Sequence, residues 1–105
     1  MNLKQLLQLT IDRNASDLHL IVGVPPALRI DGELSSVPNE GVLSRELIEG
    51  LLKEVMGSEQ LQRLLVNKEL DFSLSFSEKA RFRVNAYTQS GSYAASFRKI
   101  PLTIP

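Results

Sequence analysis

The sequence predicts an α+β domain in which an antiparallel sheet of about six strands carries helices on one face. Segments with alternating apolar and polar residues form two groups, and a block with helical periodicity separates them. Short turns containing glycine or proline join neighbouring strands, as in antiparallel hairpins. With 105 residues, of which 43% are hydrophobic, the chain fits one compact domain with a modest core.

An N-terminal helix is predicted from Leu3 to about Asn14. Its apolar residues recur at helical spacing, at Leu3, Leu6, Leu7 and Ile11. Asn2 precedes them and can cap the helix, because its short side chain accepts a hydrogen bond from a free backbone N–H. Asn14 is a residue type with which helices often end.

Three short strands are expected next, over residues 17–22, 27–31 and 33–37. The first alternates, which places one set of apolar residues on a single face: Leu18, Leu20 and Val22. The dipeptide Asp31-Gly32 is a strong signal for a tight hairpin turn between the second and third strands. The segment 23–26 is also a turn, because its two prolines cannot donate to a central ladder.

Two helices are predicted between the strand groups. Ser44 caps the first, whose apolar residues form one wide stripe: Leu47, Ile48, Leu51, Leu52, Val55 and Met56. Gly57 is expected to end this helix in a left-handed conformation. The second helix begins at Ser58 and closes at Asn67, with Leu61, Leu64 and Leu65 between them. We expect both leucine-rich faces to pack into the core, and a subunit interface is the alternative.

The remaining strands are predicted over residues 71–76 and in a long hairpin over 80–100. In the first, Phe72, Leu74 and Phe76 should point inward. In the hairpin, Phe82, Val84 and Ala86 share one face, and the other face carries Arg81, Arg83, Asn85 and Tyr87. A loop centred on Ser90-Gly91 pairs Gln89 with Ser92. Counting outward from that pair places Arg83 directly opposite Arg98.

This opposed arginine pair is the strongest functional signal in the sequence. Like charges that face each other across a ladder cost stability, so their presence favours an anion between them. An ordinary solvated face is the other interpretation of these arginines. Arginine suits phosphate because its planar fork donates two parallel hydrogen bonds and stays charged. Residues 78–105 hold five Lys/Arg and one Asp/Glu, against seven and eleven in residues 1–77. The positive charge is therefore local, and the net charge of zero argues against an obligate nucleic-acid binder.

The sequence lacks the motifs of several enzyme classes. It has no Gly-x-x-x-x-Gly-Lys-Ser/Thr loop and no Gly-x-Gly-x-x-Gly, so we expect no nucleotide hydrolysis by this chain alone. It has no cysteine, which excludes disulfides and thiolate zinc sites. No apolar run is long enough to span a bilayer, and the N-terminus has no signal-peptide pattern.

The single histidine, His19, shares a strand face with Asp17. The pair could act as metal ligands or as an acid–base pair, but a lone histidine more often packs or forms a hydrogen bond beside the sheet. We therefore predict no metal site. Arg29 and Asp31 also share a face, and the simplest interpretation is an exposed ion pair that contributes little to stability.

Five motifs follow one another along nearly the whole chain: Ala15-Ser-Asp-Leu-His-Leu20, Gly23-Val-Pro-Pro26, Leu28-Arg-Ile-Asp-Gly32, Glu69-Leu-Asp-Phe-Ser73, and Ala80-Arg-Phe-Arg-Val-Asn-Ala-Tyr87 continuing to Phe97-Arg-Lys-Ile-Pro101. In this order and spacing they resemble the opening of the type IV pilus retraction (twitching-motility) ATPases, a branch of the secretion traffic ATPases. The first motif begins soon after Met1, which favours the retraction branch over assembly and secretion members.

The resemblance implies a PAS-like N-terminal domain at residues 1–100 and, at 101–105, the start of a linker to a RecA-like ATPase domain absent from this chain. The parent would be a hexameric ATPase motor for pilus retraction and twitching motility, using ATP and Mg. This part would be non-catalytic, with no cofactor bound to it alone. The implied partners are its own and neighbouring RecA-like domains and the pilus machinery, not nucleic acid, in the cytoplasm at the inner-membrane face.

The resemblance also implies residue roles. Arg83 and Arg98, and then Arg81, would contact nucleotide phosphates that a partner core domain holds. No catalytic or metal-binding residue is implied. The other motif residues are expected to be structural: Ser16, Asp17, His19, Arg29, Asp31 and Gly32.

Two other functions fit the same residues. A free-standing PAS-like sensor would bind a small ligand in an apolar pocket between sheet and helices. A single-stranded nucleic-acid binder would use Tyr87, Tyr93 and the arginines, with strongly salt-dependent affinity.

Overall fold

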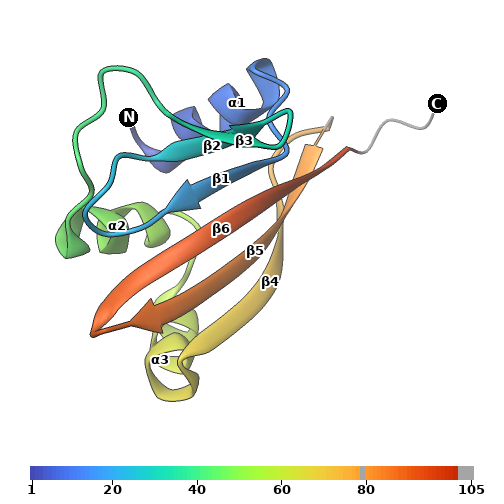
Figure 1. Ribbon diagram of the computed structural model, residues 1–105. Helices are drawn as coiled ribbons and strands as arrows, with labels where there is room; N and C mark the ends of the chain where they lie inside the picture. The colour runs from blue at the N-terminus through green and yellow to red at the C-terminus, as the bar shows by residue number, and fades with distance from the viewer. Residues whose placement is uncertain (79, 102–105) are drawn as a thin grey trace.

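A computed structural model describes residues 1–78 and 80–101. In this part of the chain three helices and six strands form one α+β domain (Figure 1). The elements are α1 (Leu3–Asp12), β1 (Asp17–Leu20), β2 (Ala27–Ile30), β3 (Glu33–Ser36), α2 (Arg45–Leu52), α3 (Ser58–Asn67), β4 (Glu69–Ser75), β5 (Ala80–Gln89) and β6 (Ser92–Pro101). The predicted fold class is confirmed. The rest of the predicted linker, residues 102–105, lies outside the described residues.

The strands form a single sheet in the order β3-β2-β1-β6-β5-β4, and every neighbouring pair is antiparallel. The two longest strands, β5 and β6, form the predicted hairpin, with Gln89 opposite Ser92. Ser90 and Gly91 both have positive φ, which lets a two-residue loop follow the twist of the strands. After this turn β6 runs back along β5, and its other edge pairs with β1 in the middle of the sheet.

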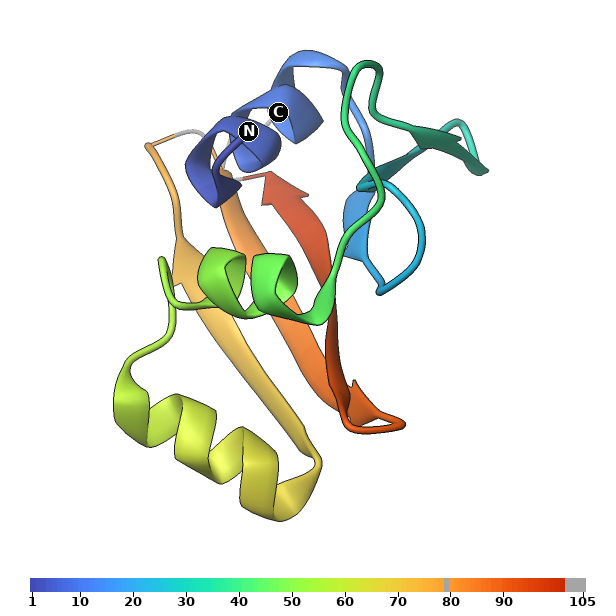
Figure 2. The ribbon, with the colours of Figure 1, turned by 90° about the vertical axis from the view of Figure 1, so that its left-hand side faces the viewer.

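The helices cover one face of this sheet, and Figure 2 looks onto that face with α1 and α2 in front of the strands. Alternation turns one set of side chains from each strand toward the helices. The largest of these are fully buried, together with leucines and an isoleucine of the three helices: Phe82, Phe97, Leu18, Leu20, Val84, Leu3, Leu6, Leu7, Ile48, Leu52 and Leu64. None of the described helices lies on the opposite face.

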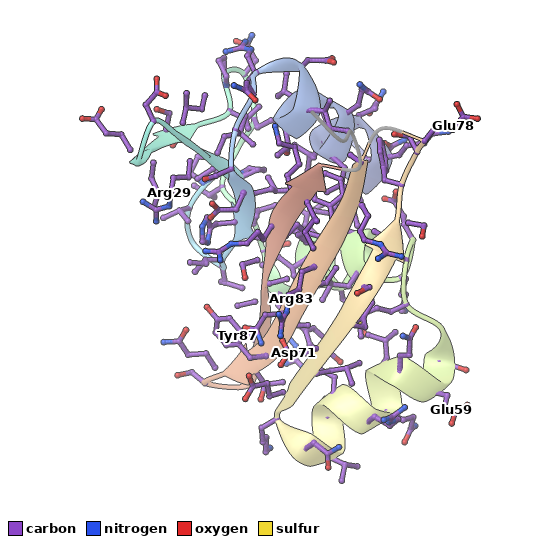
Figure 3. All side chains as sticks on the ribbon, turned by 90° about the vertical axis from the view of Figure 1, so that its right-hand side faces the viewer. Arg29, Glu59, Asp71, Glu78, Arg83 and Tyr87 are labelled. Carbon is purple, nitrogen blue, oxygen red and sulfur yellow. The ribbon has the colours of Figure 1, made fainter. Side chains whose placement is uncertain are left out.

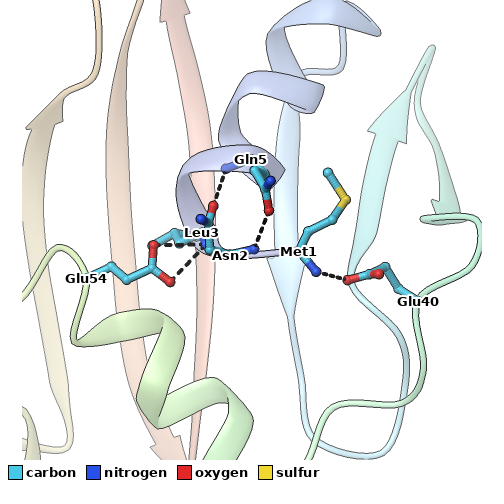
Figure 4. Close-up of polar contacts among 6 residues, drawn as sticks. All are labelled: Met1, Asn2, Leu3, Gln5, Glu40 and Glu54. Carbon is cyan, nitrogen blue, oxygen red and sulfur yellow. Dashed lines mark hydrogen bonds and ion pairs between the residues drawn. The ribbon is translucent and has the colours of Figure 1, made fainter.

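Polar contacts hold the N-terminus of α1 against the segments around α2 (Figure 4). Asn2 caps α1 by accepting from the Gln5 N–H at 2.8 Å, and the Gln5 side chain accepts from the Asn2 N–H at 2.9 Å. The Leu3 N–H donates to both carboxylate oxygens of Glu54, at 3.1 and 3.0 Å. The predicted cap is confirmed, and Glu54 adds a negative charge where the helix dipole favours one.

The helix predicted from Ser44 to Gly57 is shorter than expected. It begins after Ser44, whose Oγ accepts from the Leu47 N–H at 3.1 Å, but it ends at Leu52. Turns follow, and they carry Met56 into the core. Gly57 has φ −75° and ψ 170°, so it is extended and precedes α3 as its N-cap. The left-handed conformation expected at Gly57 occurs instead at Lys68, whose φ is 69°. Lys68 directly follows Asn67, the predicted end of the second helix.

Two other local predictions are wrong in part, namely the end of the first strand and the burial of two leucines in the helices. The first strand ends at Leu20, and Val22 is 38% exposed, because backbone hydrogen bonds tie residues 23 and 24 to Leu43 instead of extending the ladder. In the helices, Leu47 is 55% exposed and Leu65 is also exposed, since each lies at the edge of its predicted apolar stripe. Among the described residues, none of the helices has the length and apolar character needed to cross a membrane.

Candidate functional site

The face of the sheet without helices carries a row of charged side chains from neighbouring strands (Figure 3). Arg83 of β5 lies directly opposite Arg98 of β6, as predicted. On its other side Arg98 faces Asp17 of β1, and Asp17 faces Arg29 of β2. The row therefore alternates in charge at one end and places two positive charges side by side at the other.

Six residues of β1, β5 and β6 line a shallow depression of about 250 Å³ on this face: Asp17, His19, Arg83, Asn85, Ser96 and Arg98. They come from two adjacent rows of the sheet, because Ser96 lies opposite both His19 and Asn85. Four of these six side chains are groups that bind oxyanions, namely two guanidinium groups, a hydroxyl and an amide. The other two, Asp17 and His19, contact each other.

The two arginines of this depression are exposed. Within residues 1–78 and 80–101, neither side chain makes an ion pair or a hydrogen bond. Arg81, the third predicted phosphate contact, is also exposed and shares their face, but it lies opposite Ile100 and outside the depression. The structure therefore brings Arg83 and Arg98 together and leaves Arg81 at their margin.

Asp17 has the most polar contacts of this face. Its carboxylate accepts a hydrogen bond from Ser16 Oγ at 2.5 Å, contacts His19 Nε2 and lies 3.7 Å from Arg29 Nε. Burial raises the pKa of Asp17, but the hydrogen bonds from Ser16 and His19 and the charges of His19 and Arg29 outweigh it. The pKa of this carboxyl is therefore held below its ordinary value of 3.8.

The motif residues around Asp17 thus form one cluster. His19 is hydrogen-bonded beside the sheet, the structural arrangement that the sequence favoured. In the described part of the chain, no group of three or more His, Cys, Asp or Glu residues is placed to hold a metal ion.

Arg29 makes a different contact from the one predicted. Its Nη1 donates to the Gly32 carbonyl at 2.9 Å, and its ion pair is with Asp17; among the described residues it forms none with Asp31. Asp31 and Gly32 have φ of 51° and 83°, which confirms the tight turn. Because Asp31 already belongs to that turn, strand alternation ends before it, and the expected Arg29–Asp31 pair is wrong.

A polar group that sequence reasoning missed lies on the β4 side of the depression. Asn85 Nδ2 donates to Asp71 Oδ1 at 2.8 Å and to Glu69 Oε1 at 3.0 Å. Alternation had placed Asn85 on the arginine face, but its two carboxylate partners follow only from the pairing of β4 with β5. Ser96, which also lines the depression, gave no signal in the sequence.

The two tyrosines of the hairpin lie on opposite faces of the sheet. Tyr87 is half-buried on the same face as the arginines, whereas Tyr93 is buried in the core on the helix side. Burial and the nearby charge of Glu49 raise the pKa of Tyr93, and Arg45 lowers it in part. The two rings therefore cannot form one stacking surface for a nucleic acid.

Comparison with curated proteins finds relatives among pilus ATPases. The chain is 37% identical over 101 residues to the type IV pilus retraction ATPase PilT of Pseudomonas aeruginosa, which covers 96% of this chain and 29% of that protein. It is 31% identical over 105 residues to the type IV pilus ATPase PilU of the same organism, covering 100% of this chain and 27% of that protein. The chain thus spans less than a third of the length of these relatives. No protein-family profile matches it.

Comparison with solved structures agrees. The pilus retraction motor PilT with bound ADP superposes with a TM-score of 0.90 at 34% identity, over 100% of this chain and 31% of that one. The ATPase DotB of Legionella pneumophila superposes with a TM-score of 0.80 at 26% identity, over the same shares of the two chains. The sheet and helices described above are therefore shared with both ATPases.

Proposed function

The chain is a homologue of the N-terminal region of the type IV pilus retraction ATPases, within the secretion ATPase family, and we propose that it is a non-catalytic interface domain. In this proposal, Arg83 and Arg98, with Arg81 beside them, contact the phosphates of a nucleotide. An ATPase domain of the parent protein holds that nucleotide with Mg²⁺. The parent is a hexameric motor at the cytoplasmic face of the inner membrane, and it drives pilus retraction and twitching motility.

The observation that carries this proposal is the opposed and unpaired arginine pair. Two guanidinium groups directly across a ladder repel each other, and no carboxylate of the described residues neutralises either of them. A phosphate between them would turn this repulsion into charge-assisted hydrogen bonds, which are roughly twice as strong as neutral ones.

The shape of the site supports a shared rather than a self-contained nucleotide site. The depression is shallow, and the residues that line it all belong to the strands β1, β5 and β6. Phosphates are usually bound by a glycine-rich loop leading into a helix N-terminus, and this chain has no such loop. The arginines therefore complete a site whose other half belongs to a different domain.

Such a half-site also gives the domain a regulatory role. The arginines would gain phosphate contacts only when the domain lies close to a filled nucleotide site. The nucleotide would then favour the arrangement of domains in which these contacts form, because a ligand shifts an equilibrium by its difference in affinity for the two states.

The test is neutralisation of each arginine in the full-length ATPase that contains this domain. We expect Arg83→Gln and Arg98→Gln each to lower the steady-state ATP hydrolysis rate about tenfold or more, since one lost donor to a reacting oxyanion costs roughly 10²–10³ in rate. Arg63→Gln is the matched control, because Arg63 is exposed on α3 away from this face. Hydrolysis at the wild-type rate in both site variants would contradict the proposal.

The alternative of a free-standing small-ligand sensor gains no support from the core. Fully buried aliphatic and aromatic side chains, including Phe82, Phe97 and Ile48, fill the space between sheet and helices where such a ligand would bind. Their packing explains the buried face without a ligand.

A further inference from the structure

We propose that Ser16, His19 and Arg29 are positioning residues that hold the Asp17 carboxylate away from Arg98, and so keep Arg98 available for an anionic ligand. This inference rests on the proposed function of the arginine pair. It assigns an active role to motif residues that the sequence indicated only as structural.

Asp17 and Arg98 are neighbours in the sheet that could form an ion pair. The two residues lie directly opposite each other on β1 and β6, on the same face of the sheet. Opposite side chains have Cβ atoms about 4.5–5.5 Å apart, which is well within reach of an Asp–Arg ion pair. Among the described residues, Asp17 nevertheless pairs with His19 and Arg29, and Arg98 has no ionic partner.

Both oxygens of the Asp17 carboxylate are engaged by partners other than Arg98. Oδ1 accepts from the hydroxyl of Ser16 at 2.5 Å. Oδ2 contacts His19 Nε2 and lies 3.7 Å from Arg29 Nε. The side chain is only 10% exposed, so water cannot easily replace these partners. To reach Arg98, the carboxylate would have to leave a nearly complete set of contacts.

Backbone contacts hold two of the three positioning residues in place. The Ser16 N–H donates to the Arg29 carbonyl at 2.8 Å, and the Ser16 carbonyl accepts from the Lys99 N–H at 2.9 Å. Arg29 is tied to the β2–β3 turn by its bond to the Gly32 carbonyl at 2.9 Å. The turn that follows β2 therefore helps to orient a guanidinium that acts two strands from Arg98.

The consequence for the ligand is electrostatic. A carboxylate whose pKa is held below its ordinary value is ionised at neutral pH, so Asp17 would compete with phosphate for Arg98 if it were free to turn. Holding Asp17 on Ser16, His19 and Arg29 leaves the positive charges of Arg83 and Arg98 uncompensated in the depression. The cost is repulsion between them, and a bound anion would relieve it.

The experiment is a double-mutant cycle on this chain, with tripolyphosphate at low salt as the probe and NMR titration as the measurement. Ser16→Ala is the main variant, because Ser16 lies outside the lining of the depression and its loss removes no lining residue. We expect it to weaken tripolyphosphate binding about two- to fivefold, the strength of an ion pair near a surface. His19→Ala should act in the same direction, and backbone amide spectra show whether each variant is folded.

The deciding readout is rescue by Asp17→Asn. This substitution should raise affinity more in the Ser16→Ala background than in the wild type, because only there does Asp17 occupy Arg98. Equal gains in both backgrounds would overturn the proposal and leave only a general effect of charge. Lack of rescue in His19→Ala would overturn the positioning role of His19.

A second measurement needs no ligand, so it separates this inference from the proposed function. The ¹³C signal of the Asp17 carboxyl is titrated with and without Arg98→Gln. We expect Arg98→Gln to raise the pKa of Asp17 more in the Ser16→Ala background than in the wild type. An equal change in both would overturn the inference even if the arginines prove essential for hydrolysis. Conversely, the expected coupling with normal hydrolysis in the arginine variants would defeat the proposed function alone.

Discussion

The two faces of the β5–β6 hairpin differ more sharply than any two separate segments of this domain. On one face Phe82, Val84 and Phe97 have no exposed surface and pack under the helices. On the other, Arg83 and Arg98 are exposed and unpaired among the described residues. Neighbouring residues of one strand thus have opposite environments, because side chains alternate across a sheet.

This difference separates stability from binding. Burial of large apolar side chains contributes about 1.5–3 kcal/mol each, whereas exposed charges contribute little to folding. Substitutions on the covered face should therefore unfold the domain, and substitutions of the exposed arginines on the open face should change what it binds.

The adjacent residues Phe97 and Arg98 give the sharpest test. Phe97→Ala should lower the free energy of unfolding by about 3–5 kcal/mol, because it leaves a cavity in a fully buried site. Arg98→Ala should change it by less than about 1 kcal/mol, since its side chain is exposed. Urea denaturation of both variants at pH 7 measures the two effects, and similar losses would break the comparison between the faces.

Asp17 tests whether the open face contributes anything to folding. Because its pKa is lowered in the folded state, its contribution is present above the unfolded value near 3.8 and is lost as the pH falls through the folded pKa. Asp17→Asn should cost about 1.5–3 kcal/mol at pH 7, the range for hydrogen bonds to a charged group.

The control for Asp17 is the pH dependence itself. The wild type should lose stability relative to Asp17→Asn only as the pH falls below about 4, close to the ordinary pKa of 3.8. Denaturant titrations at a series of pH values test this. A constant difference between the two proteins down to the lowest pH would show that the Asp17 charge is not responsible.

The smallest effect should come from the arginine pair. Arg83→Gln removes repulsion across the ladder from Arg98, so we expect the free energy of unfolding to rise by about 0.2–1 kcal/mol at low salt. The gain should shrink as salt screens the charges. Arg63→Gln, at an exposed position on α3, should show no such gain. A loss of stability in Arg83→Gln would mean that Arg83 stabilises the fold. It would contradict the interpretation that Arg83 is unpaired and available to a ligand.

Much of the fold follows from local rules. Asn2 and Ser44 cap their helices as predicted, and the Asp31-Gly32 turn forms where expected. The register of the long hairpin also follows from counting, because a two-residue loop and alternation fix the partner of each residue. The opposed pair of Arg83 and Arg98 was predictable for that reason.

Predictions failed where tertiary contacts override a local preference. Gly57 looked like a helix end, but α2 stops earlier and the turns after it bury Met56, so Gly57 begins the next helix instead. Arg29 looked like a partner of Asp31, but β2 pairs with β1 and brings Asp17 beside it. In each case the deciding contact joins segments that no local pattern relates.

The sequence by itself determined the fold class, the two faces of the long hairpin and the pair of facing arginines, since alternation and turn chemistry are local properties. Only the tertiary structure decided that β1 pairs with β6 and thereby places Asp17 next to Arg98. It also decided that the Asp17 carboxylate turns toward Ser16, His19 and Arg29. The physical reason is that strand order depends on how the whole core packs under the helices, so charges distant in sequence become neighbours only after folding.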